Sequence, residues 1–295
     1  MKNLFGKAIP TTPTEILDNV PVKPCSEAAV LLAFSGGNDS RALAHVAKSY
    51  FADTPYRLEL AAIDTELSKD GWHEAVKDFA QWVDLPVTFW KGEGFTYYKK
   101  FVEANGFPGN AMHSQIQNRL KGRAFRKMVR DRRCGTEKSM LNAGLGVWIL
   151  SGIRKFESQK RRLLTSPYSW REGGQFINPL FYWQNHEVID YMIDYDVPFA
   201  PIKQMDCGCG ATVKDRNAEW NEIQRHCPKL HKKLTGIKNP TAWGWGEFDP
   251  ALSTIINQVT GGQMWLDDGS IESYPVCIGC ERDQAADEQA GMENW

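Results

Sequence analysis

The sequence predicts an α/β fold in which a parallel sheet is flanked by helices, followed by a smaller, irregular C-terminal lobe that contains cysteines. Two observations predict the sheet. The first is a series of apolar runs of strand length, and the second is that longer segments between them have apolar residues at helical spacing. Strands that alternate with helices in this way build βαβ units, in which right-handed crossovers join parallel strands. The lobe is predicted because most of the cysteines fall in the last third of the chain.

The individual elements follow from local patterns. Strands are expected at 28–34, 56–63, 85–90 and 146–153, and helices at 39–51, 71–83, 113–133 and 186–195. The first strand, AAVLLAF, is continuously apolar, as expected for a central strand that is covered on both faces. Residues 92–110 contain glycine and proline and are expected to form a loop.

The chain is expected to have three parts. Residues 1–24 contain several prolines and are predicted to form an extended N-terminal arm. Residues 25–203 form the main α/β domain, whose last helix is ended by Pro198 and Pro201. Residues 204–295 form the lobe that contains the cysteine pairs.

The composition is that of a soluble globular protein, with 42% hydrophobic and 24% charged residues and a net charge of −1. The small net charge excludes a strong global field, so a basic surface must be local. The N-terminus does not resemble a signal peptide, and the apolar runs are far shorter than a bilayer requires. We therefore expect a cytoplasmic protein that has no membrane partner.

A phosphate-binding loop is predicted directly after the first strand, where the sequence reads Phe34-Ser35-Gly36-Gly37-Asn38-Asp39-Ser40. Glycines at such a turn let the backbone approach an anion and permit positive φ angles. The helix that follows presents unpaired N–H groups and a positive dipole end to the same anion. A simple strand-to-helix connection is the alternative, but the complete motif between a strand and a helix favours phosphate binding.

These residues resemble the SGGxDS signature of the PP-loop, or N-type ATP pyrophosphatase, superfamily. The resemblance implies a Rossmann-like sheet that binds ATP, with the loop holding its pyrophosphate. Many members have lysine where this chain has Asn38, so one cation is missing from the expected phosphate site. The Walker A pattern does not occur in the sequence, which argues against a nucleotide triphosphatase of that type.

Further segments resemble the phosphoadenosine phosphosulfate (PAPS) reductase branch of this superfamily. They are Ile63-Asp64-Thr65, the GIRKFES segment 152–158 followed by Arg161, and the segment 178–183 followed by Glu187-Val188. DNA-phosphorothioation and thiolation sulfurtransferases are similar relatives. The resemblance and the position of these segments after strands imply nucleotide-binding roles for Phe34, Ser35, Gly36, Gly37, Asn38, Asp39, Ser40, Asp64, Thr65, Gly152, Arg154, Glu157 and Arg161.

Catalytic roles are expected for Ser40, Asp39, Lys121 and Arg154, with Mg²⁺ accompanying ATP. Arginines such as Arg154 bind phosphate or sulfate oxygens in bidentate fashion. Glu157 either orients Arg154 or holds Mg²⁺. Lys121 follows Gln117, which replaces a cysteine of the relatives, and is a candidate triphosphate contact.

The segment from Arg119 to Arg133 is strongly basic, with Asp131 as its one acidic residue. Closely spaced lysines and arginines bind a nucleic-acid backbone without sequence preference, which makes a nucleic acid a candidate acceptor. A solvated helix face is an equally good interpretation.

Two close cysteine pairs predict a metal or cluster site. Cys207, Cys209, Cys277 and Cys280 supply four thiolates, enough for tetrahedral Zn²⁺ or a [4Fe–4S] cluster. Cys227 belongs to an apolar helical stripe, so we expect it in the core, with ligation in place of Cys207 or Cys209 as the alternative. The resemblance favours the iron–sulfur cluster, whereas the spacing fits either.

Three functions remain open. The first is adenylation of an acceptor by ATP with pyrophosphate release, with sulfur transfer from a donor protein to follow. The second is thiol-dependent reduction of PAPS or adenylylsulfate, which is disfavoured by the intact loop and by the absence of the E-C-G-x-H signature. The third is a non-catalytic component that binds nucleotide or nucleic acid within an assembly.

Overall fold

The computed structural model describes residues 10–21, 29–108, 112–132, 147–157, 165–171, 174–201 and 216–238. Its six-stranded sheet has the order β3-β2-β1-β4-β6-β5. The strands are β1 (Ala29–Phe34), β2 (Arg57–Asp64), β3 (Val87–Lys91), β4 (Val147–Leu150), β5 (Tyr168–Arg171) and β6 (Gly174–Ile177). Neighbouring strands run parallel except for β5 and β6, which pair antiparallel. The predicted α/β class is therefore confirmed.

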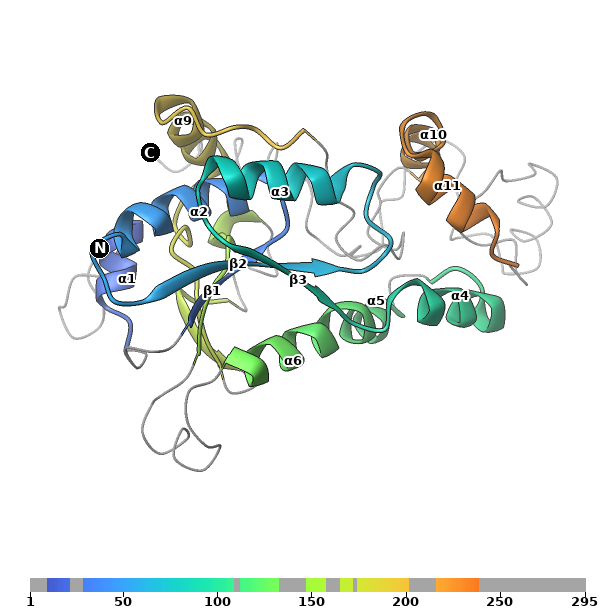
Figure 1. Cartoon of the computed structure of the whole chain (residues 1–295), viewed down its shortest axis with the longest axis horizontal. Helices are drawn as coiled ribbons and strands as arrows, with labels where there is room; N and C mark the ends of the chain where they lie inside the picture. Colours follow the sequence, from blue (N-terminus) through green and yellow to red (C-terminus); the bar gives the residue numbers. More distant parts are fainter. Residues whose placement is uncertain are drawn as a thin grey trace, which may run out of the picture.

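Helices cover both faces of the sheet, as Figure 1 shows. On one face lie α1 (Pro13–Asp18), α2 (Asn38–Phe51), α3 (Trp72–Trp82) and α9 (Asn185–Asp194), and on the other lies α6 (Arg123–Arg132). Alternate residues of β1 face the helices on opposite sides of the sheet. Val30 and Leu32 pack with α2 and α3, whereas Leu31 packs with α6. Burial on both faces explains why this strand is continuously apolar.

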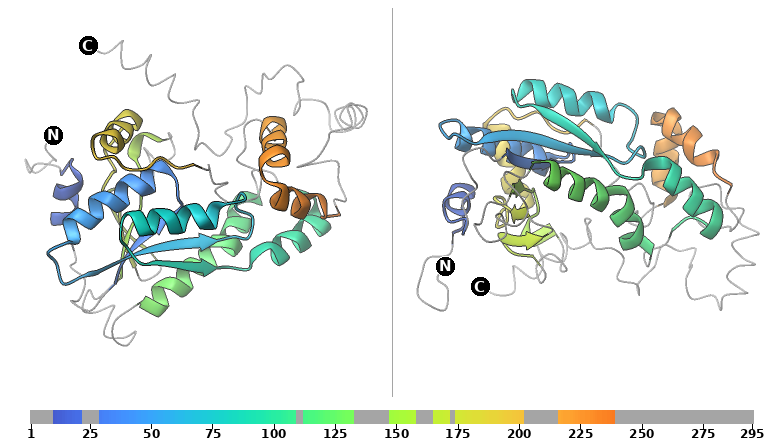
Figure 2. Two further views of the ribbon diagram at one scale, coloured as in Figure 1. Left: turned by 45° about the horizontal axis from the view of Figure 1, so that its top comes forward. Right: turned by 60° about the horizontal axis from the view of Figure 1, so that its bottom comes forward.

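A second core lies beyond the ends of β2 and β3 (Figure 2). It joins α4 (Gly94–Asn105), α5 (His113–Gln117) and the π-helical turn η2 (Asn118–Gly122) to the hairpin of α10 (Arg216–His226) and α11 (Pro228–Thr235). Its centre includes Leu67, Tyr98, Leu120 and Ile223, all fully buried. None of the helices in the described ranges is long and apolar enough to cross a membrane.

Two predictions of local structure were wrong. Residues 94–105, predicted to be part of a loop, form α4, because Tyr98, Phe101 and Val102 place one apolar face in the second core. The N-terminal arm was predicted to be extended but contains α1. Thr12 and Glu15 form a reciprocal capping box at its start, and Pro13 occupies the first helical position, where proline is favoured. The predicted boundary between residues 203 and 204 lies outside the described residues.

An ion pair between a buried glutamate and a partly exposed arginine connects α6 to the sheet. Glu59 of β2 is 2% exposed, and Arg132 donates to its two carboxylate oxygens at 3.1 and 2.9 Å. Arg132 also lies 5.2 Å from the ring centroid of Trp90. Burial alone would raise the pKa of Glu59, but hydrogen bonds from Arg132 and Thr88 and the charges of Arg132 and Arg57 hold it below its ordinary value.

Replacing Glu59 by glutamine is expected to lower the free energy of unfolding by about 2 kcal/mol at pH 7, because Arg132 loses its charged partner. A carboxylate whose pKa is lowered by folding stabilises the protein above its unfolded pKa, and this contribution is lost as the pH falls through the folded pKa. The difference between wild type and Glu59→Gln should therefore shrink towards pH 3 in denaturant titrations. Asp84→Asn, which removes an exposed surface pair with Lys48, is the control and should change the free energy of unfolding much less than Glu59→Gln. A difference that is independent of pH would contradict this account.

Candidate functional site

The turn between β1 and α2 is the predicted phosphate-binding loop. Strand β1 ends at Phe34, and α2 begins after Gly37, which provides no side-chain cap for the helix N–H groups. Gly36 has a φ of +87°, a left-handed conformation that favours glycine. A Cβ atom at Gly36 would also lie 3.3 Å from Trp72 Nε1, so both the backbone and the packing require glycine here.

Two consecutive carbonyl groups of this turn are held on the core side. Trp72 Nε1 donates to the Ser35 carbonyl at 2.9 Å, and Arg41 Nε donates to the Gly36 carbonyl at 2.9 Å. In a trans peptide the C=O and the following N–H point in opposite directions. The N–H groups of Gly36 and Gly37 are therefore turned away from these anchors, and successive N–H groups of this kind form an anion-binding nest.

Two serines complete the loop. The Ser40 hydroxyl donates to the Gly37 carbonyl at 2.8 Å and lies 3.4 Å from the Ser35 hydroxyl. The Ser35 hydroxyl also accepts from the Gly37 N–H at 3.4 Å, a long bond that an anion can replace. The Asn38 side chain accepts from the Ala200 N–H at 2.9 Å and so connects α2 to the segment after α9.

An ion pair joins the loop to the segment after β4. Arg154 is 6% exposed, and its Nε lies 3.1 Å from Asp39 Oδ1 while its Nη2 donates to Asp39 Oδ2 at 3.3 Å. Glu157 accepts the Arg154 backbone N–H at 2.9 Å and so fixes the turn that carries the arginine. A Cβ atom at Gly152 would lie 3.1 Å from that of Asp39, which explains the close approach of the two segments.

Between these segments lies a cavity of about 500 Å³. It is lined by Ala33, Ser35, Gly37, Asn38, Asp39, Ser40, Phe125, Ser151, Gly152, Ile153, Arg154, Glu157, Thr165, Ser169, Phe176, Asn178 and Asn185. Because β1 and β4 lie side by side while the chain continues from β1 to β2 on the other side, the cavity sits at the switch point of the sheet. Ligands of open α/β sheets bind at this position.

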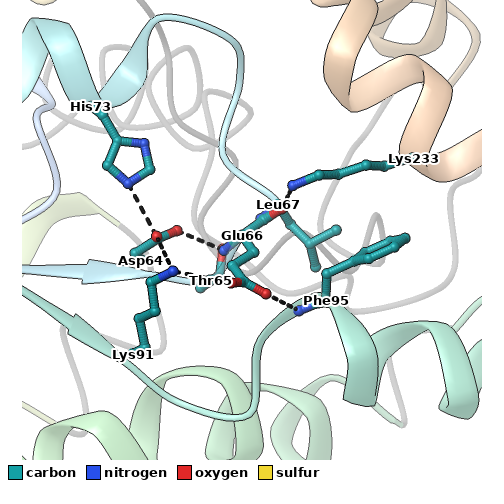
Figure 3. Close-up of polar contacts among 8 residues, drawn as sticks. All are labelled: Asp64, Thr65, Glu66, Leu67, His73, Lys91, Phe95 and Lys233. Atoms are coloured by element: carbon teal, nitrogen blue, oxygen red, sulfur yellow. Dashed lines mark hydrogen bonds and ion pairs between the residues drawn. The ribbon is translucent and has the colours of Figure 1, made fainter.

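Asp64 and Thr65 belong to a separate polar cluster at the ends of β2 and β3 (Figure 3). The buried Asp64 carboxylate lies 3.0 Å from His73 Nε2 and 3.5 Å from Lys91 Nζ, and it accepts the Glu66 N–H at 2.7 Å. Thr65 is fully buried. The structure therefore places these two predicted residues on the β2 side of the sheet, whereas the cavity lies on the β4 side.

Glu66 holds this cluster together in a strained conformation, with a φ of 60°. Its carboxylate accepts from the Phe95 N–H at 3.0 Å and from Lys91 Nζ at 3.1 Å, and its carbonyl accepts from Lys233 Nζ at 2.8 Å (Figure 3). The hydrogen bond from the Phe95 N–H, followed by that of Lys91, lowers the pKa of Glu66 below its ordinary value. The cluster thus connects the ends of the strands to α4 and α11.

Other predicted site residues lie elsewhere. The Phe34 side chain is buried and stacks on Phe79 with ring centroids 5.2 Å apart, so only its backbone adjoins the loop. Lys121 lies in η2, which packs against Gly92 at the end of β3. Arg161 lies outside the described residues. The catalytic and binding roles of all these residues remain predictions.

Several cations of the basic segment are engaged within the protein. Arg119 and Arg123 both pair with Glu93, and Arg132 pairs with the buried Glu59. Arg126 donates to the Asn118 side chain at 3.0 Å. The charge available to an external phosphate backbone is therefore smaller than the sequence alone indicates, although the predicted nucleic-acid contact stays untested.

The four paired cysteines, Cys207, Cys209, Cys277 and Cys280, lie outside the described residues, so their predicted metal or cluster site remains a prediction. Cys227 is 4% exposed within the second core, as its apolar stripe predicted. Burial raises the pKa of its thiol. Since metals are held by thiolates, this environment favours a core role for Cys227.

Sequence reasoning missed several residues of the site. Trp72 and Arg41 hold the loop carbonyls, yet in the sequence they are ordinary members of helical segments. Ser151 and Asn178, which bond each other at 2.7 Å in the cavity wall, were also missed. Their positions next to the matched segments 152–158 and 178–183 were the available signal.

Comparisons with known proteins found similar sequences and folds. The sequence model of the phosphoadenosine phosphosulfate reductase domain matches residues 29–209. The uncharacterized protein MJ0973 of Methanocaldococcus jannaschii is 25% identical over 247 residues, which cover 77% of this chain and 54% of that protein. This chain therefore spans about half the length of that curated relative.

Two solved structures illustrate the structural comparison. A phosphoadenylyl-sulfate reductase from Candida auris, in a phosphate complex, gives a TM-score of 0.41 at 18% identity and covers 64% of this chain and 82% of its own. The U34-tRNA thiolase NcsA from Methanococcus maripaludis, with its [4Fe–4S] cluster, gives a TM-score of 0.41 at 14% identity and covers 91% and 84%.

The two loop glycines provide a matched test of the nest. Gly36→Ala is expected to lower the free energy of unfolding by about 1–2 kcal/mol, because a Cβ atom is strained at this φ, and to weaken pyrophosphate binding. Gly37→Ala is the control: its φ is −76°, and its Cβ would meet only the Ser35 hydroxyl at 3.5 Å. Thermal unfolding and calorimetric titration of pyrophosphate measure both effects. Equal effects of the two substitutions would contradict the assigned loop geometry.

Proposed function

The chain belongs to the phosphoadenosine phosphosulfate reductase domain family, and from this premise we propose that it binds ATP and transfers the adenylyl group to an acceptor with release of pyrophosphate. One observation carries the proposal. Ser35, Gly37 and Ser40 of the loop line one wall of a cavity of about 500 Å³, and Arg154 lines the same cavity. Donors on both sides of one cavity suit a ligand with several phosphate groups.

In the proposed reaction an acceptor oxygen attacks the α-phosphorus of ATP. The new P–O bond forms as the bond to the α–β bridging oxygen breaks, pyrophosphate leaves with that electron pair, and the acceptor gives its proton to solvent. The nest and Ser40 bind the leaving pyrophosphate, whose negative charge grows during the step. Preorganised donors of this kind are most effective where charge develops.

Arg154 would change partners when the nucleotide binds. In the structure its guanidinium pairs with Asp39 at 3.1 Å. A phosphate in the cavity offers a more highly charged, bidentate partner for the same fork. Arg154 would then bind phosphate oxygens and free the Asp39 carboxylate.

The freed carboxylate fits a role in holding Mg²⁺. Mg²⁺ at nucleotide sites is held by one or two carboxylates together with phosphate oxygens, and Asp39 and Glu157 are the carboxylates that line the cavity. When bound there, Mg²⁺ would neutralise part of the negative charge of the phosphates. Asp39 would orient it, and Glu157 would continue to fix the Arg154 backbone through their 2.9 Å hydrogen bond.

Sulfur transfer after adenylation is the finer form of this proposal. An adenylated oxygen is a good leaving group. Hydrosulfide delivered by a sulfur donor protein would attack the activated carbon of a nucleic acid or small molecule, forming the C–S bond as the C–O bond breaks and AMP leaves with that oxygen. The cysteine pairs of the sequence support sulfur or cluster chemistry. Lys121 of η2 and the exposed Lys127 and Arg130 of α6 support a nucleic-acid acceptor.

Reduction of PAPS or adenylylsulfate is the second candidate, because the family model is that of a reductase domain. The complete SGGxDS loop favours ATP splitting, since a reductase does not need to retain a leaving pyrophosphate. The two functions differ in their products. Adenylation releases pyrophosphate from ATP, whereas reduction releases sulfite from PAPS in the presence of a thiol reductant.

Ser40→Ala is expected to lower kcat/KM for pyrophosphate release by about one to two orders of magnitude, because a hydroxyl donor to the leaving group is lost. Ser49→Ala is the matched control: it lies on the same helix, is exposed and donates only to the His45 carbonyl. Both variants are assayed with anaerobically purified protein, ATP and Mg²⁺, with RNA, DNA or neither as acceptor. The visible spectrum and metal content of the same preparation test the cluster.

The outcomes separate the candidates. Pyrophosphate release that requires Ser40 but not Ser49 supports adenylation, and dependence on RNA or DNA identifies the acceptor class. Sulfite release from PAPS without turnover of ATP would establish the reductase instead. Nucleotide binding without either product would indicate a non-catalytic component.

A further inference from the structure

A buried cation lies directly behind the loop. Arg41 of α2 is 3% exposed, although no part of the loop motif predicts it. Its donors reach three segments: Nε bonds the Gly36 carbonyl at 2.9 Å, Nη1 the Pro198 carbonyl at 3.2 Å and Nη2 the Ala75 carbonyl at 3.2 Å. The guanidinium also lies 4.6 Å from the ring centroid of Phe79. One side chain therefore holds together the loop, α3 and the segment after α9.

The charge of Arg41 is not neutralised by these bonds. All three acceptors are uncharged backbone carbonyls, and Asp78 acts on Arg41 through its charge alone. Burial lowers the pKa of Arg41 to about 10, so the side chain remains protonated at neutral pH. Burying a charge in this way is costly, and the cost is explained most simply if the cation serves the neighbouring site.

The loop geometry indicates what the cation does. The bond to the Gly36 carbonyl turns that oxygen away from the cavity, and the Gly37 N–H on the same peptide consequently points the other way. A positive charge inside the protein is screened less than one at the surface, so it adds to the potential of the nest. Asn38, at the position where a lysine is expected, is engaged by the Ala200 N–H instead.

We propose that Arg41 is a positioning residue of the phosphate site: it orients the Gly36–Gly37 peptide and supplies, from the core side, the positive charge that Asn38 does not provide. This inference rests on the proposed function, in that the ligand is a nucleotide with a pyrophosphate group. Arg41 itself does not touch the ligand. Its contribution grows with the negative charge of the ligand, so it favours ATP and pyrophosphate over AMP.

Three variants test the proposal. Arg41→Gln removes the charge, Arg41→Lys keeps the charge but loses the planar fork, and Lys48→Gln removes one charge from the other end of the same helix, where Lys48 pairs with Asp84. Calorimetric titrations with inorganic pyrophosphate, ATP and AMP are made in low and high salt for each variant. Thermal unfolding of each variant records its stability separately.

Arg41→Gln is expected to weaken pyrophosphate and ATP binding about tenfold, and AMP binding much less, because the loss follows ligand charge. For pyrophosphate, the ratio between the dissociation constants of Arg41→Gln and wild type should be the same in low and high salt, since a buried charge is poorly screened. Arg41→Lys should recover most of the affinity, and Lys48→Gln should behave as wild type. If Arg41→Gln fails to fold, a folded Arg41→Lys that retains the preference for pyrophosphate over AMP supports the proposal.

Other outcomes would overturn it. A folded Arg41→Gln that binds pyrophosphate as wild type does would show that the charge is not used. Equal losses for AMP and pyrophosphate, or equal losses for the lysine and glutamine variants, would indicate a purely structural role. If the wild-type protein binds neither pyrophosphate nor ATP, the proposed function itself fails, which is distinguishable from all of these results.

Discussion

Two backbone carbonyls determine the candidate site, because their direction decides where the adjacent N–H groups point. The Ser35 carbonyl is held by Trp72 from α3, and the Gly36 carbonyl by Arg41 from α2. Both donors are buried in the layer of helices on one face of the sheet. The protein's own contacts therefore fix the conformation of the loop, so that a ligand would not have to supply the energy to create it.

Charge is distributed around this loop in a way that suits an incoming anion. The cation of Arg154 is paired with Asp39 inside the cavity, where a phosphate can compete for it, whereas the cation of Arg41 stays behind the loop. Many cations of the basic segment have structural partners instead, as Glu59 and Glu93 show. With a net charge near zero, the local arrangement of charges determines the potential around the loop.

The sequence predicted the parts of the fold that depend on local patterns. The predicted local structure was correct for β1, the turn after it and the start of α2. Here an apolar run, a glycine turn and a helical pattern follow one another directly along the chain. Helix α4 was missed because Gly92 and Gly94 at its start resemble a loop, while the core that buries Tyr98 is completed by α10 and α11 from much later in the sequence. The role of Arg41 was invisible for the same reason, since its partners Ala75 and Pro198 are distant in the chain.

The most direct measurement of the central claim is an experimental structure of the protein bound to ATP in which a methylene group replaces the α–β bridging oxygen. The account predicts that the β and γ phosphates lie within hydrogen-bonding distance of the Gly36 and Gly37 N–H groups and the Ser40 hydroxyl. It also predicts that Arg154 leaves Asp39 for a phosphate oxygen. Phosphates bound elsewhere, with the Arg154–Asp39 pair intact and the nest facing solvent, would contradict it.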